Sequence, residues 1–157
     1  MLAKGVLPVG AHHLTMTGAV SDTYVAALQH DLVEVPEGAH VLGVVRRPTP
    51  WFWAQVDANE PALAPPTELL DAVKVRQAEL QTTGLDDAPA HNAAMDEVDY
   101  EARYLAHLEE SEDARAAIDD LRARLAEGED VVLVCFENTD EKRCHRTLLR
   151  ERLERGG

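Results

Sequence analysis

Two short runs of apolar residues predict buried strands. The first is Val41–Val45 and the second is Val131–Phe136, and each follows a turn that contains glycine. Continuous runs of this length that are rich in β-branched residues are typical of parallel strands covered on both faces. A third, weaker strand is expected at residues 5–9 or 13–17.

Helical patterns fill most of the remaining chain. We expect helices over residues 22–32, 67–80, 96–109, 112–126 and 146–153. Ser21 and Ser111 are good N-cap residues for the first and fourth of these. Residues 82–92 have no apolar periodicity and are expected to form a loop. Strands separated by helices predict an α/β fold, with a layered, largely parallel central sheet flanked by helices, in a single domain over residues 1–157.

The composition favours a cytoplasmic globular protein. The chain is 45% hydrophobic and 28% charged, which is enough apolar material for a packed core. No apolar run approaches the roughly 20 residues needed to cross a bilayer, so no membrane partner is expected. Residues 1–13 lack the apolar run of a signal peptide. The two cysteines are too few for a disulfide framework.

The charge of the chain is strongly negative. There are 29 acidic residues against 15 lysines and arginines, for a net charge of −14. This balance argues against duplex nucleic acid as a partner, since no overall positive charge attracts it. Excess carboxylate with scarce lysine suits a protein adapted to concentrated salt, of haloarchaeal type. The alternative is an ordinary acidic protein from a GC-rich genome. The cations cluster within residues 142–155, where such a patch either holds an anion or pairs with the protein's own carboxylates.

The segment most suggestive of chemistry is residues 131–153. A buried strand leads through Glu137 to Cys144, His145 and Arg146 at the start of a helix. Ligands of open α/β sheets bind where strand ends meet helix N-termini, and such termini attract anions and lower the pKa of a nearby thiol. We expect Arg146 to hold an anion and Glu137 or His145 to act as acid or base. Cys144 would be a nucleophile or a polar wall of the pocket.

Other interpretations of this segment stay open. A zinc site could use Cys135, Cys144 and His145, although no CxxC pair is present. The cysteine–arginine spacing of protein phosphatases is absent, because Glu141 stands six positions after Cys135. Adjacent residues on one helix point about 100° apart, so a direct contact between Cys144 and His145 is not expected. Both residues also fit a purely structural place in the core.

A second cluster follows the first predicted strand. Arg46 and Arg47 stand there beside three of the seven aromatic residues of the chain, the first of which is Trp51. If the two strands are parallel neighbours, these arginines reach the same sheet edge as Glu137 and Cys144. Arg46, Arg47 and Trp51 would then bind a flat, anionic ligand such as a nucleotide. In the alternative interpretation the aromatic residues cap the core and the arginines pair with acidic side chains.

Together these segments resemble the family known as domain of unknown function 488. Cys144-His145-Arg146, preceded by the strand and its Cys-x-Glu step, is similar to the C-terminal signature of that family. Val44-Val45-Arg46 resembles its early strand, which ends in Asp-Val-Arg. The resemblance spans roughly residues 41–153 and implies an α/β fold without an assigned reaction. It also implies that five side chains gather at one pocket, namely Arg46, Glu137, Cys144, His145 and Arg146. Val44 stands where the family has aspartate, which implies a different substrate or activity.

The expected function is that of an enzyme acting on a phosphate-bearing or nucleotide-like molecule at the carboxyl edge of the sheet. The expected partner is therefore a small anionic molecule or nucleotide, and no cofactor is expected. One alternative is a non-catalytic ligand-sensing or protein-interaction module that uses the same basic pocket. Another is a metal-binding protein. The sequence favours no particular oligomeric state.

Overall fold

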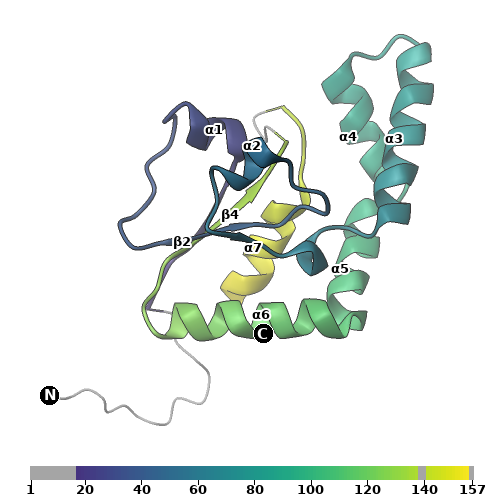
Figure 1. Cartoon of the computed structure of the whole chain (residues 1–157). Helices are drawn as coiled ribbons and strands as arrows, with labels where there is room; N and C mark the ends of the chain where they lie inside the picture. Colours follow the sequence, from purple (N-terminus) through teal and green to yellow (C-terminus); the bar gives the residue numbers. More distant parts are fainter. Residues whose placement is uncertain (1–16, 138–140, 156–157) are drawn as a thin grey trace, which may run out of the picture.

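A four-stranded parallel sheet forms the centre of the molecule. The structure, a computed structural model, describes residues 17–137 and 141–155. The strands lie in the order β1–β4–β2–β3, and every neighbouring pair is parallel. Their bounds are β1 Val20–Tyr24, β2 His40–Gly43, β3 Ala58–Asn59 and β4 Val131–Cys135. The sheet and the helices on both of its faces confirm the layered α/β fold (Figure 1).

The two strongest strand predictions are confirmed as neighbours, with shifted ends. β4 occupies the predicted run and pairs with β2 along residues 40–43. β2 ends two residues earlier than predicted, although the amide of Val44 still donates to the carbonyl of Val134 at 2.9 Å. Beyond that point the side chain of Asn59 replaces a neighbouring strand, since its amide group exchanges two hydrogen bonds with the backbone of Val45.

The first predicted helix is wrong in its first turn. Residues 20–24 form the edge strand β1, and α1 covers only Val25–Gln29. β1 pairs with β4 along its whole length, so tertiary pairing outweighs the local helical pattern. Ser21 lies opposite Val132 in this ladder and caps no helix. The weak third strand was expected at residues 5–9 or 13–17, which lie outside the described residues except for Thr17, and Thr17 is not in a strand.

The later helices follow the predicted boundaries more closely. Their bounds are α2 Pro50–Trp53, α3 Thr67–Thr82, α4 Asp87–Glu97, α5 Tyr100–Glu110, α6 Glu112–Ala126 and α7 His145–Arg155. α6 matches its prediction at both ends. The hydroxyl oxygen of Ser111 accepts a hydrogen bond from the amide of Ala114 at 3.1 Å, as expected of an N-cap.

The loop predicted over residues 82–92 is wrong in its second half, where α4 begins. The buried face of α4 includes Ala90 and Ala94, whose small side chains give little apolar periodicity but let the helix pack closely against α3. The helix expected from residue 96 is instead split in two. Asp99 adopts a left-handed conformation with φ of 58°, which ends one helix and lets α5 start in a new direction.

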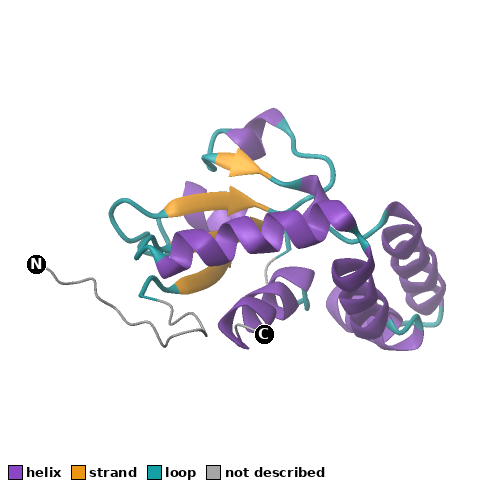
Figure 2. Cartoon of the chain, turned by 90° about the horizontal axis from the view of Figure 1, so that it is seen from below, coloured by secondary structure: helices purple, strands orange, loops and turns teal. Residues whose placement is uncertain are grey.

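The two faces of the sheet bury different helices. Val131 and Leu133 of β4 pack into a core with α5, α6 and α7, whereas Val132 and Val134 face α1 and α2. Figure 2 shows the strand arrows pointing toward the side on which α3 and α4 stand. The carboxyl ends of the strands therefore face this helical hairpin. No helix in the described parts of the chain is long and apolar enough to span a bilayer.

Candidate functional site

A cavity of about 320 Å³ lies at the carboxyl edge of the sheet. Its walls are the residues that follow β2 and β4, the segment that leads into α7, and one side of the α3–α4 hairpin. Five of the seven predicted site residues line it, namely Arg46, Arg47, Glu137, Cys144 and His145. The other two, Trp51 and Arg146, lie outside the lining.

Cys144 and His145 are in direct contact, contrary to the prediction from helix geometry. The Sγ atom of Cys144 lies 3.4 Å from Nδ1 of His145. α7 begins at His145, so Cys144 precedes the helix and the angular separation of helical neighbours does not apply to this pair. The carbonyl of Cys144 accepts a hydrogen bond from the amide of Thr147 at 3.3 Å, which fixes the cysteine to the first turn of α7.

The imidazole of His145 is held in one orientation. Its Nε2 lies 2.6 Å from the carbonyl oxygen of Val44, and a carbonyl only accepts, so Nε2 carries a hydrogen. In the neutral ring, Nδ1 is then an acceptor that faces the sulfur of Cys144. The ring also meets Tyr104 edge-on, with centroids 5.4 Å apart, while the Tyr104 hydroxyl donates to the carbonyl of Leu63. The sulfur of Cys144, the imidazole of His145 and the carbonyl of Val44 thus contact one another in turn, as a nucleophile, a base and a group that orients the base would.

Arg146 is buried behind the two cysteines. Its side chain is fully covered and donates to Sγ of Cys135, to the carbonyl of Glu137 at 2.9 Å and to the carboxylate of Asp22 at 3.1 Å. Asp22 also accepts from Arg150 at 2.7 Å. The guanidinium therefore places positive charge beside the sulfurs. It does not itself form part of the cavity wall, where the sequence analysis expected it.

The thiols of Cys135 and Cys144 influence each other's ionisation and have opposite pKa shifts. Burial raises the pKa of the Cys135 thiol well above its ordinary value, and the hydrogen bond to Cys144 raises it further. Burial also opposes ionisation of Cys144, but the hydrogen bond from Cys135 and the nearby His145 and Arg146 outweigh it. The pKa of the Cys144 thiol is therefore well below its ordinary value. Cys144 therefore loses its proton more readily than Cys135.

The arginines that follow β2 have different surroundings. Arg46 donates to the carbonyls of Ala64 and Pro65 at 3.1 and 3.0 Å, so it anchors the loop before α3. Arg47 is exposed, and the described part of the chain supplies it with no hydrogen bond or ion pair. Only Arg47 of the two is therefore available to a ligand through its whole guanidinium.

Lys74 of α3 also lines the cavity. It is exposed and makes no ion pair with any residue that the structure describes. Lys74 was not predicted as a site residue, because its place on the cavity wall depends on how α3 packs in the tertiary structure. The one available signal was a cation on a predicted helix between the two strand-edge segments.

The aromatic residues of α2 divide between surface and core. Trp51 is 41% exposed, whereas its neighbour Phe52 is fully buried and contacts the ring of Phe136 with centroids 4.8 Å apart. Phe52 therefore caps the core, as one interpretation expected. The ligand-binding role of Trp51 stays a prediction that its position outside the cavity does not support.

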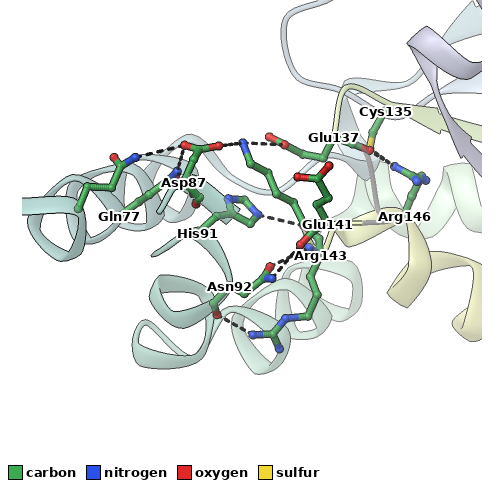
Figure 3. Close-up of polar contacts among 11 residues, drawn as sticks. Gln77, Asp87, His91, Asn92, Cys135, Glu137, Glu141, Arg143 and Arg146 are labelled. Atoms are coloured by element: carbon green, nitrogen blue, oxygen red, sulfur yellow. Dashed lines mark hydrogen bonds and ion pairs between the residues drawn. The ribbon is translucent and has the colours of Figure 1, made fainter. Parts of the chain in front are cut away.

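α4 holds the segment that leads into Cys144, as Figure 3 shows. The side-chain oxygen of Asn92 accepts from the amide of Arg143 at 2.9 Å, and its nitrogen donates to the carbonyl of Glu141 at 3.0 Å. His91 donates from Nε2 to the carbonyl of Arg143 at 3.0 Å. These contacts were missed because this part of the chain was predicted to be a loop.

Lys142 joins the end of β4 to the same helix. Its ammonium lies 2.5 Å from the carboxylate of Asp87 and 3.6 Å from that of Glu137. Glu137, predicted as an acid or base, thus lies on the cavity wall beside a cation.

The cysteines and His145 lie together, but their arrangement does not form a metal site. Within the described residues, no group of three or more His, Cys, Asp or Glu side chains is placed to hold a metal ion. The two nitrogens of His145 point at the carbonyl of Val44 and at the sulfur of Cys144.

Comparison with known proteins identifies one family. The family described as the active DUF488-N3 subclade matches residues 24–157. The matched span includes every residue that lines the cavity. No curated protein and no solved structure matches the chain.

Proposed function

The chain belongs to the domain of unknown function 488 family, and from this premise we propose that it is a cysteine-dependent enzyme acting on a small phosphate-bearing or nucleotide-like anion. The contact between Cys144 and His145 carries the proposal. The sulfur is poised as a nucleophile, Nδ1 of the ring accepts its proton, and the carbonyl of Val44 keeps the ring in the required tautomer. The cavity gives a small substrate access to this pair.

The charges of the cavity wall support an anionic substrate. Arg46, Arg47 and Lys74 all line the cavity. Asp71 and Glu137 are the acidic residues of the lining. Cations thus outnumber acids around the cavity in a chain whose net charge is −14. Guanidinium and ammonium groups that line one cavity suit phosphate or carboxylate oxygens.

The reaction begins with attack by Cys144 on an electrophilic atom of the anion. As the bond from sulfur forms, the proton of the thiol resides on Nδ1 of His145. The bond to the leaving group then breaks, and the leaving group takes that proton. Arg146 contributes by holding positive charge beside the thiols without touching the substrate.

Protection of Cys144 from alkylation tests this function. Reduced protein is treated with iodoacetamide at neutral pH, with or without AMP or inorganic phosphate, and the modified peptides are quantified by mass spectrometry. We expect rapid alkylation of Cys144 and strong suppression by AMP or phosphate. Arg47→Gln and Lys74→Gln should weaken the protection several-fold, since each removes one cation from the wall.

Arg115→Gln is the matched control, because Arg115 is an exposed arginine of α6 that does not line the cavity. It should leave the protection unchanged. Slow alkylation of Cys144 in the folded protein, or alkylation that neither anion slows, would contradict the proposal.

A ligand-sensing module is the second candidate function. It is favoured by the burial of Cys144, which is only 6% exposed, and of His145, whose ring nitrogens both contact the protein itself. In that case AMP binds equally well to the wild type and to Cys144→Ser, and the thiol is inert toward iodoacetamide. If Arg47→Gln loses the protection of Cys144 but still binds AMP as the wild type does, AMP binds outside this cavity. That result would contradict both functions.

A further inference from the structure

Both cysteines of the chain meet at the cavity. Cys135 is the last residue of β4, and Cys144 precedes α7, so the loop after the strand brings the second thiol back to the first. Both side chains are buried, both line the cavity and both belong to the same apolar cluster. Arg146, which donates to the sulfur of Cys135, directly follows His145, whose ring contacts the sulfur of Cys144. The proposed anion chemistry uses Cys144 and leaves Cys135 without a role.

The surroundings of the two sulfurs are unequal in a way that assigns different roles. Cys144 has Nδ1 of His145 3.4 Å from its sulfur and is slightly exposed on the cavity wall. Cys135 is completely buried and receives a hydrogen bond from Arg146. A small oxidant entering the cavity thus meets the more accessible thiol at Cys144, which has a base beside it, while Cys135 lies in the same buried cluster. This arrangement is that of an attacking cysteine and a resolving cysteine.

We propose that Cys135 and Cys144 form a peroxide-reactive dithiol, in which Cys144 reduces a small hydroperoxide and Cys135 closes an intramolecular disulfide. This activity goes beyond the proposed function. It shares the nucleophilic sulfur of Cys144 with that function but requires no anion in the cavity.

In the first step the sulfur of Cys144 attacks one oxygen of the hydroperoxide. A sulfur–oxygen bond forms and the oxygen–oxygen bond breaks. The departing oxygen leaves as an alcohol or water, with the proton that His145 took from the thiol. Sulfur is oxidised by two electrons to a sulfenic acid, and the peroxide is reduced by two.

In the second step the sulfur of Cys135 attacks the sulfur of the sulfenic acid. A sulfur–sulfur bond forms and the sulfur–oxygen bond breaks. The hydroxide leaves as water with the proton of the Cys135 thiol. Arg146 favours this step because its guanidinium stabilises negative charge on Cys135 as the proton departs. A small dithiol reductant then restores both thiols by exchange.

The test treats the reduced, full-length chain with hydrogen peroxide and measures its intact mass without reductant. The wild type should stay monomeric and its mass should fall by that of two hydrogen atoms, as one intramolecular disulfide requires. Dithiothreitol should restore the original mass. Cys135→Ser should instead accumulate a sulfenic acid that dimedone traps on Cys144. Cys144→Ser should form neither product at a comparable rate. Cys135→Ala provides the same readout if serine is not tolerated in the core.

His145→Gln tests whether the imidazole activates the attacking sulfur. Its amide can still donate to the carbonyl of Val44 but has no basic nitrogen. The oxidation rate should fall several-fold, because the thiol loses the neighbouring base that favours its ionised form. Arg115→Gln should be oxidised at the wild-type rate.

Three results would overturn the dithiol. One is oxidation of the wild type to sulfinic acid without a disulfide, and another is a disulfide formed only between two chains. The third is equally fast sulfenic acid formation at Cys135 in Cys144→Ser. Because the assay contains no anionic ligand, its outcome is independent of the AMP-protection experiment.

Discussion

At the scale of single residues, Arg146 is unusual because its charged side chain is buried in the protein interior. It is completely buried and its hydrogen bonds reach β1, the end of β4 and a cysteine sulfur. Such a group is retained in a protein interior only when its donors are satisfied. The structure satisfies them with Asp22 and with the backbone of Glu137. Arg146 therefore couples the stability of the sheet edge to the charge at the thiols.

Replacing Arg146 by glutamine should destabilise the protein strongly. The change removes several buried hydrogen bonds and half of a buried ion pair, which typically costs about 3–5 kcal/mol. Urea unfolding followed by circular dichroism measures the loss. Arg150→Gln is the matched control, because Arg150 pairs with the same Asp22 but is 33% exposed. It should cost about 1 kcal/mol or less. Equal losses for both variants would contradict the special role of the buried guanidinium.

The candidate site shows which of its residues could be predicted from the sequence. Cys144, His145 and Glu137 were predicted at one pocket because a buried strand and a helix N-terminus bracket them, and the structure places them there. The contact between Cys144 and His145 was not predicted. The two residues were treated as neighbours on one helix, whereas Cys144 precedes the start of α7. Asp22 was missed because tertiary pairing, not local pattern, makes its segment a strand.

At the scale of helices and strands, the N-caps separate confirmed predictions from wrong ones. Ser111 caps α6 as its position before two acidic residues predicts, and Ser21 was expected to do the same for a helix that the structure replaces with β1. Both serines precede acidic residues in the sequence. The difference arises because residues 20–24 have β4 to pair with, whereas α6 buries a continuous apolar face against the sheet.

Alanine substitutions at these two serines should have different effects. Ser111→Ala removes the hydrogen bond to the amide of Ala114 and should lower the free energy of unfolding by about 1 kcal/mol. Ser21→Ala changes an exposed strand position and should stay within about 0.5 kcal/mol of the wild type. Thermal and urea unfolding of the two variants provide the comparison. A larger loss for Ser21→Ala than for Ser111→Ala would be inconsistent with the observed β1 strand.

The α3–α4 hairpin is the element that the sequence predicted least well. α3 was predicted from its start, but the alanine-rich face of α4 carries too little periodicity to reveal a helix. The same hairpin supplies Lys74 to the cavity wall and holds the segment before Cys144 through Asn92. Lys74 and Asn92 reach the site only because the helices pack together in the tertiary structure. The local sequence pattern therefore could not predict them as site residues.

At the scale of the whole molecule, charge is distributed unevenly. The chain has a net charge of −14, while the lysine and arginine side chains that line the candidate cavity outnumber the acidic ones by three to two. Under the proposed function, this arrangement would direct a small anion to the cavity. It also leaves many carboxylates to repel one another when salt is scarce.

The melting temperature should therefore rise with salt. Screening of the carboxylates by sodium or potassium chloride removes self-repulsion in the folded chain, so we expect higher stability in multimolar salt than in dilute buffer. Differential scanning fluorimetry over a salt series measures this. A melting temperature that stays level or falls across the series would count against salt adaptation.

The direct test of the central claim is the pH dependence of Cys144 alkylation. The pKa of this thiol is below its ordinary value, so the rate should stay high as pH falls through about 8.5, where an ordinary thiol becomes protonated. The rate should decline only at lower pH, as the sulfur takes up its proton. In His145→Gln the decline should move to higher pH, while unfolding curves confirm that the variant is folded. A wild-type rate that declines from about pH 8.5, together with an unchanged profile in His145→Gln, would contradict the Cys144–His145 pair as a reactive centre.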